Sequence, residues 1–423
     1  MRVAIIGAGI VGVSTAYELA LQGHEVTVFE RRSSVAEEAS FANAGVIAPG
    51  YVGPWAAPGM RWRLLRQLLG ADGPARLGGW NALSQLPWLW RWSRACRPKV
   101  HASNRAAMVR LAQFSQDRLL RLTRDLDLEF EQTPGFLVLM RGERDLKAAR
   151  AHLAVLRELG VTHEMVDAAR SRQIEPSLNP EAPLHAAIHL PNDGVGNCRH
   201  FAHLMRARAQ RLGATFRFDT TVSALTASSR PTLQLDPADG AQSTTAEMDA
   251  VVVCAGARAN AVLASVGLRL PLAPVHGYSI TAALRHVDGL PPMGPSAAVM
   301  DERFKVAISR LGQRVRVSGV AELGGRLDHL AAAPLATLYR VLDDWFPGAA
   351  LTREAQQWKG ARPMLPEGPP VLGPSGAPGV WLNLGHGASG WALACGSARV
   401  LAEQIGRRPA PLDLSGMTAD RWR

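Results

Sequence analysis

Three glycines near the start of the chain, Gly7, Gly9 and Gly12, have the spacing that binds the phosphates of a dinucleotide. In this pattern the first glycine permits a tight turn, the second lets the backbone approach the pyrophosphate, and the third lets a helix pack closely. The unpaired N–H groups at the start of that helix attract the phosphate charge. Glu30 follows the glycines and can accept hydrogen bonds from ribose hydroxyls.

The residues around the glycines predict the elements that this chemistry requires. Residues 2–6 form a short, mostly apolar run that predicts a strand, and residues 13–22 predict a helix. A second strand is predicted over residues 25–29, so that Glu30 lies at its end. Strand, glycine turn, helix and second strand together predict a dinucleotide site of the Rossmann type.

A second apolar run lies far along the chain and bears on which dinucleotide is bound. Residues 250–254 predict a strand that runs into Ala255 and Gly256. We interpret it as a strand that returns to the nucleotide domain after an inserted substrate region. NAD and FAD share the glycine motif, but this arrangement is typical of two-domain flavoenzymes.

Length and composition place the chain among large folded proteins. Its 423 residues, 47% hydrophobic and 20% charged, predict an ordered chain of about two or three lobes. The four cysteines are far apart, so we expect neither disulfides nor a metal site. The uncharged N-terminal stretch is too short and too glycine-rich for a membrane span, and we expect no export signal and a cytoplasmic location.

The net charge of +11 is concentrated in one segment, residues 55–100. This segment has seven arginines and one lysine against a single acid, Asp72, and it holds six of the eleven tryptophans. Tryptophan with arginine is typical of a protein that lies on an anionic membrane surface, and we expect peripheral contact with a membrane. The alternative is a tryptophan-rich core patch with solvated arginines. No nucleic-acid motif accompanies the charge, so we expect no nucleic-acid partner.

Several blocks of sequence closely resemble the bacterial D-amino acid dehydrogenase small-subunit family, which belongs to the D-amino acid oxidase superfamily. The resemblance covers about the first 415 residues in order. The blocks that carry it are residues 40–59, 190–193, 301–308, 358–366 and 385–397. It implies an α/β fold in which an FAD-binding, glutathione-reductase-like Rossmann domain is interleaved with an α+β substrate domain on an antiparallel sheet.

The resemblance also implies a domain division and an activity. We expect residues 1–80, 195–265 and 355–415 to form the FAD-binding domain, and residues 81–194 and 266–354 to form the substrate domain. The implied reaction oxidises a D-amino acid to its imino acid, which water converts to a 2-oxo acid and ammonia. Electrons would pass to a quinone of the inner membrane or a similar acceptor, the segment 55–100 would contact the membrane surface, and a second subunit is a possible partner.

The expected catalytic residues are Arg362, His386, Tyr51 and Tyr278. Arg362 lies in an element similar to the one whose arginine binds the substrate carboxylate in D-amino acid oxidases, and a guanidinium grips a carboxylate at two points. The alternative is a structural arginine beside a proline turn. Around His386, the backbone amides of the glycine turn are better candidates than the ring for stabilising charge on the reduced flavin. The two tyrosines are candidate pocket hydroxyls or packed core residues.

The expected FAD-binding residues follow from the motif and from the resemblance. Arg31 and Arg32 would flank the adenine ribose or form a solvated turn, and Val222 would cover the adenine with its backbone. The full set is Gly7, Gly9, Ile10, Val11, Gly12, Glu30, Arg31, Arg32, Ser40, Ala42, Asn43, Ala44, Gly45, Val222, Ala255, Gly256, Gly360, Gly385, His386, Gly387, Gly390 and Trp391.

Two positions depart from the family pattern. The family has lysine where this chain has His276, and threonine where it has Leu384. Histidine titrates near neutrality, so substrate preference or pH dependence is expected to differ. Open alternatives are a D-proline or D-hydroxyproline dehydrogenase, an amine oxidase of the same fold that uses oxygen, a flavin subunit without its own turnover, and an NAD-dependent dehydrogenase.

Overall fold

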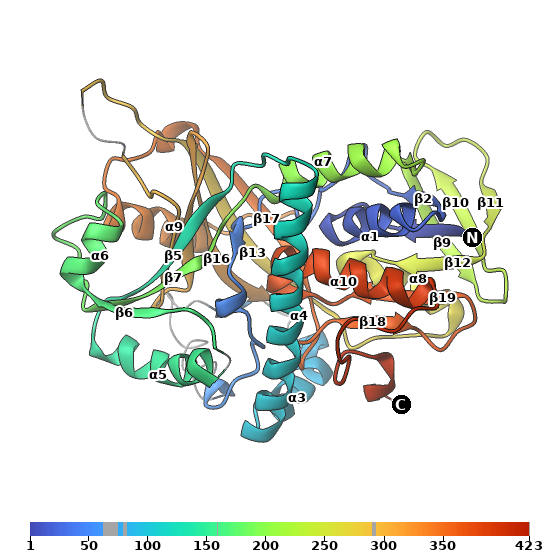
Figure 1. Ribbon diagram of the computed structural model, residues 1–423, viewed down its shortest axis with the longest axis horizontal. Helices are drawn as coiled ribbons and strands as arrows, with labels where there is room; N and C mark the ends of the chain where they lie inside the picture. The colour runs from blue at the N-terminus through green and yellow to red at the C-terminus, as the bar shows by residue number, and fades with distance from the viewer. Residues whose placement is uncertain (62–74, 79–82, 159, 290–292, 423) are drawn as a thin grey trace.

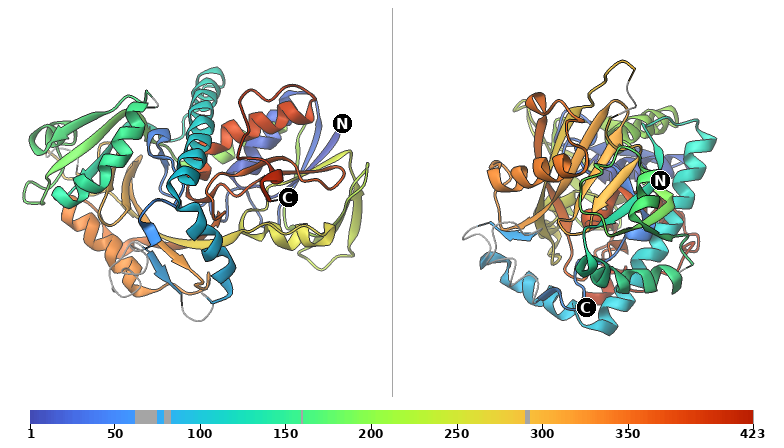
Figure 2. Two further views of the ribbon diagram at one scale, coloured as in Figure 1. Left: turned by 90° about the horizontal axis from the view of Figure 1, so that it is seen from below. Right: turned by 90° about the vertical axis from the view of Figure 1, so that its left-hand side faces the viewer.

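The computed structural model describes residues 1–61, 75–78, 83–158, 160–289 and 293–422. It has two lobes, each built on its own sheet, and the long helix α4 (Pro98–Asp125) stands between them (Figure 1). Figure 2 shows the same two lobes from below, with both termini on the lobe that holds β1 (Arg2–Ile6).

The first lobe contains a six-stranded sheet. Its strand order is β18 (Val371–Pro374), β19 (Val380–Leu384), β12 (Ala250–Val253), β1, β2 (Glu25–Phe29) and β8 (Thr215–Arg217). All neighbours are parallel except the pair β18 and β19. Parallel strands are buried on both faces, which is why β1 and β12 consist almost entirely of apolar residues. Because β12 pairs with β1, the predicted return of residues 250–254 to the nucleotide domain is confirmed.

Helices cover one face of this sheet and a small meander covers the other. The helices are α1 (Ile10–Leu21), α7 (Cys198–Arg211) and α10 (Gly390–Ile405), which share one hydrophobic core with β1 and β2. The meander consists of β9 (Thr220–Thr226), β10 (Thr232–Pro237) and β11 (Thr244–Glu247), and it packs with α8 (Ala259–Leu263). This arrangement agrees with the predicted Rossmann-type layer.

The second lobe contains a ten-stranded, mostly antiparallel sheet. Its main path is β17 (Gln356–Met364), β13 (Ala273–Ala283), β16 (Arg314–Leu323), β15 (Val306–Leu311), β14 (Ala298–Asp301), β5 (Thr133–Met140), β7 (Ala186–Val195) and β3 (Val46–Ile47). Two further strands pair off this path: β4 (Ala75–Leu77) with β16 and β6 (Glu164–Asp167) with β7. The helices of this lobe are α9 (Ala332–Trp345), α5 (Glu143–Glu158) and α6 (Ala168–Ile174). The predicted antiparallel substrate sheet is therefore confirmed.

Short helical segments complete the described chain. Helix α3 (Leu86–Ala95) precedes α4, and 3-10 turns occur at Pro49–Tyr51, Gly256–Arg258, Ala264–Val266, Thr352–Glu354, Gly387–Ser389 and Ala419–Trp422. Among the described helices, none is both long enough and apolar enough to cross a bilayer.

Strand pairing places some segments in a different lobe from the one that the predicted domain division gives them. Strand β17 falls in the segment 355–415, which we expected in the FAD-binding domain, but it pairs with β13 of the ten-stranded sheet. Conversely, α4 falls in the segment 81–194 but packs closely against α10. The division grouped residues by the chemistry of their motifs, whereas hydrogen bonding groups them by sheet. The exact boundaries stay a prediction.

Candidate cofactor and active site

A single cavity of about 1400 Å³ runs between the two lobes. Ligand pockets usually measure about 300–1,000 Å³, so this cavity has room for a dinucleotide together with a second small molecule. All of the predicted site residues line it except Gly12 and Arg32. Segments that are hundreds of residues apart in sequence therefore meet at one site.

The glycine turn has the geometry that the motif predicts. Gly7 has φ of 104°, in the region that favours glycine, and its N–H donates to the carbonyl of Phe29. A Cβ on Gly12 would lie 1.9 Å from the carbonyl oxygen of Gly7, so Gly12 serves helix packing and does not reach the cavity. A Cβ on Gly9 would meet only Ser40 Oγ, at 3.5 Å, because Gly9 faces the cavity. Gly9 is also the N-cap of α1 and has no side chain to cap it; the N–H of Ile10 donates to Ser40 Oγ, which leaves the N–H groups of Val11 and Gly12 for a phosphate.

Glu30 lies at the end of β2 and faces the cavity beside this turn. Its carboxylate accepts from the backbone N–H of Ala8 at 2.7 Å and from that of Arg32 at 2.9 Å. These two bonds fix the carboxylate while its remaining lone pairs can accept from hydroxyls. Arg31 lines the cavity and pairs with Glu38, whereas the side chain of Arg32 turns outward to the same Glu38.

The loop Ser40–Gly45 connects the glycine turn to the second lobe. Ser40 Oγ accepts from the N–H of Ile10 at 3.1 Å, and the Asn43 side chain accepts from the N–H of Gly45 at 3.1 Å. Gly45 has φ of 73°, and a Cβ there would press on the carbonyl of Gly196 at 3.2 Å. The loop is thus held from both sides and presents its backbone to the cavity.

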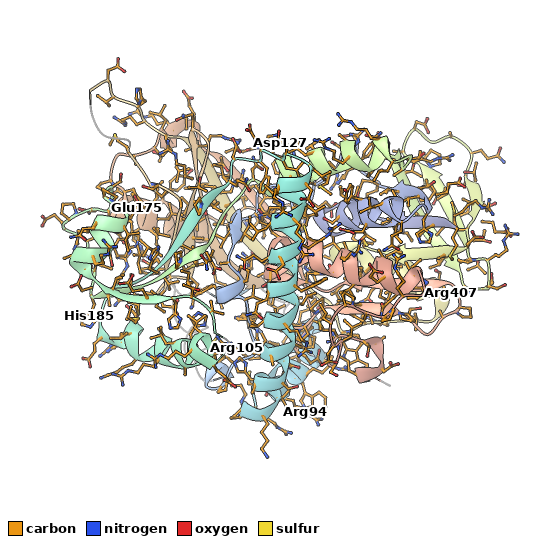
Figure 3. All side chains as sticks on the ribbon, in the orientation of Figure 1. Arg94, Arg105, Asp127, Glu175, His185 and Arg407 are labelled. Carbon is orange, nitrogen blue, oxygen red and sulfur yellow. The ribbon has the colours of Figure 1, made fainter. Side chains whose placement is uncertain are left out.

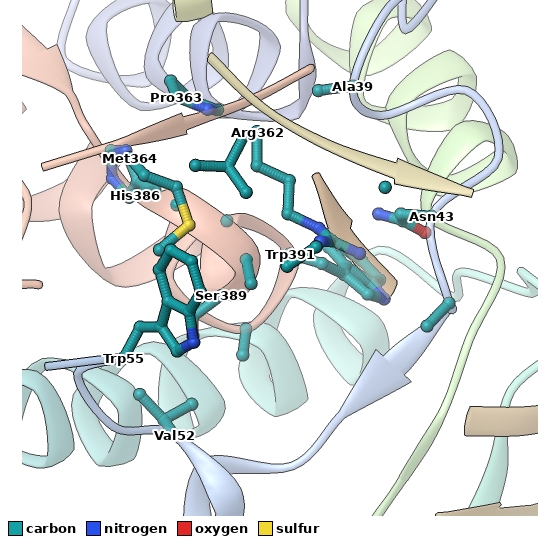
Figure 4. Close-up of a pocket in the computed structure, with 18 of the residues that line it drawn as sticks. Ala39, Asn43, Val52, Trp55, Arg362, Pro363, Met364, His386, Ser389 and Trp391 are labelled. Carbon is teal, nitrogen blue, oxygen red and sulfur yellow. The ribbon is translucent and has the colours of Figure 1, made fainter. Parts of the chain in front are cut away.

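Arg362 projects from β17 into the cavity (Figure 4). Its Nη1 donates to the carbonyl of Val320 at 2.8 Å, and no described carboxylate lies within ion-pair distance of it. A Cβ on Gly277 would lie 2.3 Å from the guanidinium, so a glycine on β13 makes room for this side chain. Burial lowers the pKa of Arg362 to about 10, which leaves it charged at neutral pH. A cation facing a cavity without a counter-ion is arranged to bind an anion.

The turn from Gly385 to Trp391 leads into α10 and also faces the cavity. His386 is buried, and its Nε2 is hydrogen-bonded to Ser397 Oγ at 3.0 Å; the Ser397 hydroxyl also donates to the carbonyl of Ala394. Burial lowers the pKa of His386 to about 3, so the ring is neutral. Because the ring is hydrogen-bonded to Ser397 inside α10, the N–H groups at the start of α10 are the donors of this turn that an anionic ligand can use.

The two tyrosines line the cavity, but their hydroxyls have protein partners. Tyr51 donates to Glu302 at 2.7 Å and accepts from Lys305 at 2.8 Å. Tyr278 donates to Glu322, which is also paired with the buried Lys359 at 2.7 Å. Their predicted role as pocket residues stays a prediction, and both are tied into charged clusters.

His276, which departs from the family pattern, is buried beside this second cluster. Burial, together with the charge of Lys359, lowers its pKa, and its Nδ1 has no hydrogen-bond partner among the described residues. It does not line the cavity. An effect of His276 on the substrate would therefore act through Glu322 and Lys359.

The tryptophan-rich patch that the sequence offered as one alternative is part of the site, and sequence reasoning missed this connection. Trp55 lines the cavity and packs on Trp88 and Trp92, with ring centroids 6.0 and 5.6 Å apart. The indole of Trp88 donates to the carbonyl of Met364, two residues after Arg362. Trp88 and Trp92 are buried, as the core-patch alternative for the segment 55–100 predicts, whereas Trp90 is exposed and contact with a membrane stays a prediction. Trp62 and Trp80 lie outside the described residues.

Arg316 was also missed. It lies on β16, is only 5% exposed, and donates through Nη1 to the carbonyl of Asn43 in the Ser40–Gly45 loop. In the sequence it alternates with Val315 and Val317, as an outward-facing residue of a half-buried strand would. Only the packing of the loop on the strand reveals that this face is covered.

The fold and the cavity define a flavoenzyme of two interleaved lobes, and comparison with known proteins identifies its family. The sequence model of the family of FAD dependent oxidoreductases matches residues 2–404, and the chain belongs to this family. Its dinucleotide is FAD. The cavity fits this cofactor, because Gly9 has no obstructing neighbour, the start of α1 lines the cavity, and Glu30 faces it at the place of a ribose.

Two close relatives are D-amino acid dehydrogenases. The protein from Rhizorhabdus wittichii is 39% identical over the full length of both chains. The one from Cereibacter sphaeroides is 40% identical and covers all of this chain and 95% of its own. Among solved structures, glycine oxidase from Geobacillus kaustophilus aligns over 99% of this chain and 98% of its own, with a TM-score of 0.74 and 21% identity. Iminodiacetate oxidase from Chelativorans sp. also aligns over 99% of this chain and 98% of its own, with a TM-score of 0.73 and 24% identity. Both solved structures have the same fold as this chain.

Proposed function

We propose that this chain is an FAD-dependent D-amino acid dehydrogenase, which oxidises the α-carbon of D-amino acids and passes the electrons to a separate acceptor. The observation that carries the proposal is Arg362, a cation without a carboxylate partner in the described chain, in the same cavity as the glycine turn and the start of α10. The names of the full-length relatives support the substrate class.

Arg362 would hold the substrate carboxylate. A guanidinium binds both carboxylate oxygens in one plane, which fixes the α-carbon relative to the cavity wall. Its bond to Val320 uses one Nη1 hydrogen and leaves donors on the other nitrogens for this purpose. Positioning of this kind supplies much of the rate enhancement in a reaction that joins two bound partners.

When bound, FAD supplies the hydride acceptor for the α-hydrogen of the substrate. The substrate nitrogen provides the electron pair that forms the C=N bond and loses a proton, and water then releases ammonia from the imino acid to leave a 2-oxo acid. Because the nitrogen must offer its lone pair as the hydride leaves, we expect the amine to react as the neutral base. The N–H groups at the start of α10 would stabilise negative charge that arises in the cavity.

We also propose that the acceptor is a quinone reached at the surface of the inner membrane. The face of α3 opposite its buried tryptophans supports this, because Leu86 and Trp90 are 57% and 59% exposed. Arg94 lies over the Trp90 ring at 4.7 Å, and Figure 3 places Arg94 at the lower end of the molecule. Exposed apolar side chains beside arginines fit an anionic lipid surface. A second subunit at this surface stays a prediction.

The test is an anaerobic visible spectrum of the holoenzyme, recorded during addition of single D- and L-amino acids. Bleaching of the flavin by D-enantiomers alone, with rapid recovery on adding a quinone analogue and slow recovery in air, is the expected result. Fast recovery in air with formation of peroxide would replace the dehydrogenase by an oxidase. A flavin that no amino acid bleaches would remove the substrate assignment and leave the family.

A further inference from the structure

Arg316 is a buried cation whose two hydrogen-bond acceptors, a hydroxyl and a carbonyl, are neutral. Its side chain is 5% exposed, Nε donates to Thr281 Oγ1 at 2.9 Å, and Nη1 donates to the carbonyl of Asn43 at 3.2 Å. Among the described residues, no carboxylate lies within ion-pair distance of it. Burying a guanidinium costs several kcal/mol unless a negative charge offsets that cost.

The charged neighbours of Arg316 leave a net positive charge at this place. Arg314 is paired with Glu131 at 2.9 Å, and Arg199 is paired with Glu37 at 2.7 Å, so each of these acids already has its own cation. Burial raises the pKa of the nearby Cys198 thiol to about 12, which keeps it uncharged. Burial lowers the pKa of Arg316 to about 10, so it carries its charge at neutral pH.

The position of Arg316 links this charge to the cavity. Arg316 and Ser318 are two residues apart on β16 and point to the same face of the sheet, and Ser318 lines the cavity. Asn43, which accepts from Arg316, also lines the cavity, and Figure 4 shows it among the residues around Arg362 and Trp391. Arg316 itself does not line the cavity, so it acts from behind the Ser40–Gly45 loop.

We propose that Arg316 offsets the negative charge that FAD gains on reduction, and thereby sets the reduction potential of the bound cofactor. A hydride brings two electrons and one proton to the ring system, so the reduced cofactor carries one more negative charge than the oxidised one. A fixed cation in a low-dielectric site favours the reduced form. Arg316 is a positioning residue in this role, because it acts through the field across the Asn43 loop and touches no reacting atom.

The experiment is an anaerobic equilibration of the holoenzyme with a reference dye, which measures the midpoint potential without any amino acid. Arg316→Gln keeps hydrogen-bond donors toward Thr281 and Asn43 but removes the charge. We expect its two-electron reduction to be at least about tenfold less favourable than that of the wild type, which corresponds to a potential about 30 mV lower. Arg316→Lys keeps the charge, and we expect its equilibrium constant to stay within about threefold of the wild type.

Arg314→Gln is the matched control. It removes an arginine of the same strand that is exposed and paired with Glu131, and because solvent screens this pair we expect a smaller drop in potential than in Arg316→Gln. An Arg316→Gln holoenzyme with the wild-type potential overturns the proposal, as does an equal drop in Arg314→Gln. If Arg316→Gln does not bind FAD, the potential of Arg316→Lys tests the proposal instead. A large drop in potential in this variant, which keeps the charge, also overturns the proposal. Since no substrate is involved, the result is independent of the proposed D-amino acid activity.

Discussion

Arg362 donates through Nη1 to the carbonyl oxygen of Val320 at 2.8 Å, and this is the single side-chain hydrogen bond recorded for it within the described chain. The bond joins β17 to β16, which lies on the far side of β13, and it holds the guanidinium against Gly277. Both predicted interpretations of this arginine therefore apply in part, because it donates to a carbonyl and still has free donors in the cavity.

Substitution of Arg362 should separate carboxylate binding from FAD binding. Arg362→Lys keeps the charge but loses the two-point grip, and we expect kcat/KM for D-amino acids to fall about tenfold or more. Arg362→Met should lower it by about 100-fold or more, since a charged hydrogen bond contributes about 3 kcal/mol. The FAD content, measured from the visible spectrum, should not change. Arg310→Met is the control, because Arg310 donates to the carbonyl of Gly312 and does not line the cavity. Wild-type kinetics in Arg362→Met would exclude the carboxylate role.

Two alanine substitutions in the glycine turn should have opposite consequences. Gly9→Ala places a methyl group at the mouth of the cavity without a close protein neighbour, so the apoprotein should keep its Tm while the Kd for FAD rises about tenfold or more. Gly12→Ala would place its Cβ 1.9 Å from the carbonyl oxygen of Gly7, so the fold itself should be destabilised. Differential scanning fluorimetry of the apoproteins and FAD titration distinguish the two. A stable apoprotein from Gly12→Ala would contradict the packing role.

The nucleotide half of the site could be predicted from the sequence because its signals are local. The turn, the helix start and Glu30 all lie within thirty residues, and their spacing alone defines the geometry. Arg362 was predicted through a family resemblance and not from local pattern. The partners of these residues could not be predicted, because the contact of Trp88 with Met364 and that of Arg316 with Asn43 each join positions more than 250 residues apart.

Helix α3 provides a test of membrane association. The double substitution Leu86→Ser and Trp90→Ser removes the two exposed apolar side chains while Trp88 and Trp92 keep the helix packed. We expect binding to vesicles of phosphatidylcholine with phosphatidylglycerol to fall about tenfold or more in co-sedimentation, since each apolar side chain buried in lipid contributes about 1 kcal/mol or more. Binding of the wild type should weaken as salt is added. Leu120→Ser is the control, because Leu120 is 60% exposed on α4. Equal binding by the double variant and the wild type would contradict a docking role for α3.

Asp193 should make folding stability depend on pH in a specific direction. It is 4% exposed on β7, and its Oδ2 accepts from the N–H of Gly50 at 3.2 Å. Burial raises the pKa of Asp193 from 3.8 to about 7, although the bond from Gly50 lowers it in part. A carboxyl group whose pKa is raised by folding binds its proton more tightly in the folded state. Its contribution to stability is therefore present at low pH and is lost as the pH rises from about 4 to about 7.

Asp193→Asn removes this titration while keeping an oxygen that can accept from Gly50. The free energy of unfolding of the variant, relative to wild type, should rise by about 1.4 kcal/mol for each pH unit between pH 4 and pH 7. The added amide N–H groups shift this difference by a constant, so the slope is the quantity to measure, by urea unfolding of the apoprotein at several pH values. Asp125→Asn is the control for an aspartate on the surface, because Asp125 is exposed and paired with Arg124. A flat difference for Asp193→Asn would mean that the carboxyl is already ionised at pH 5 and that another group compensates its charge.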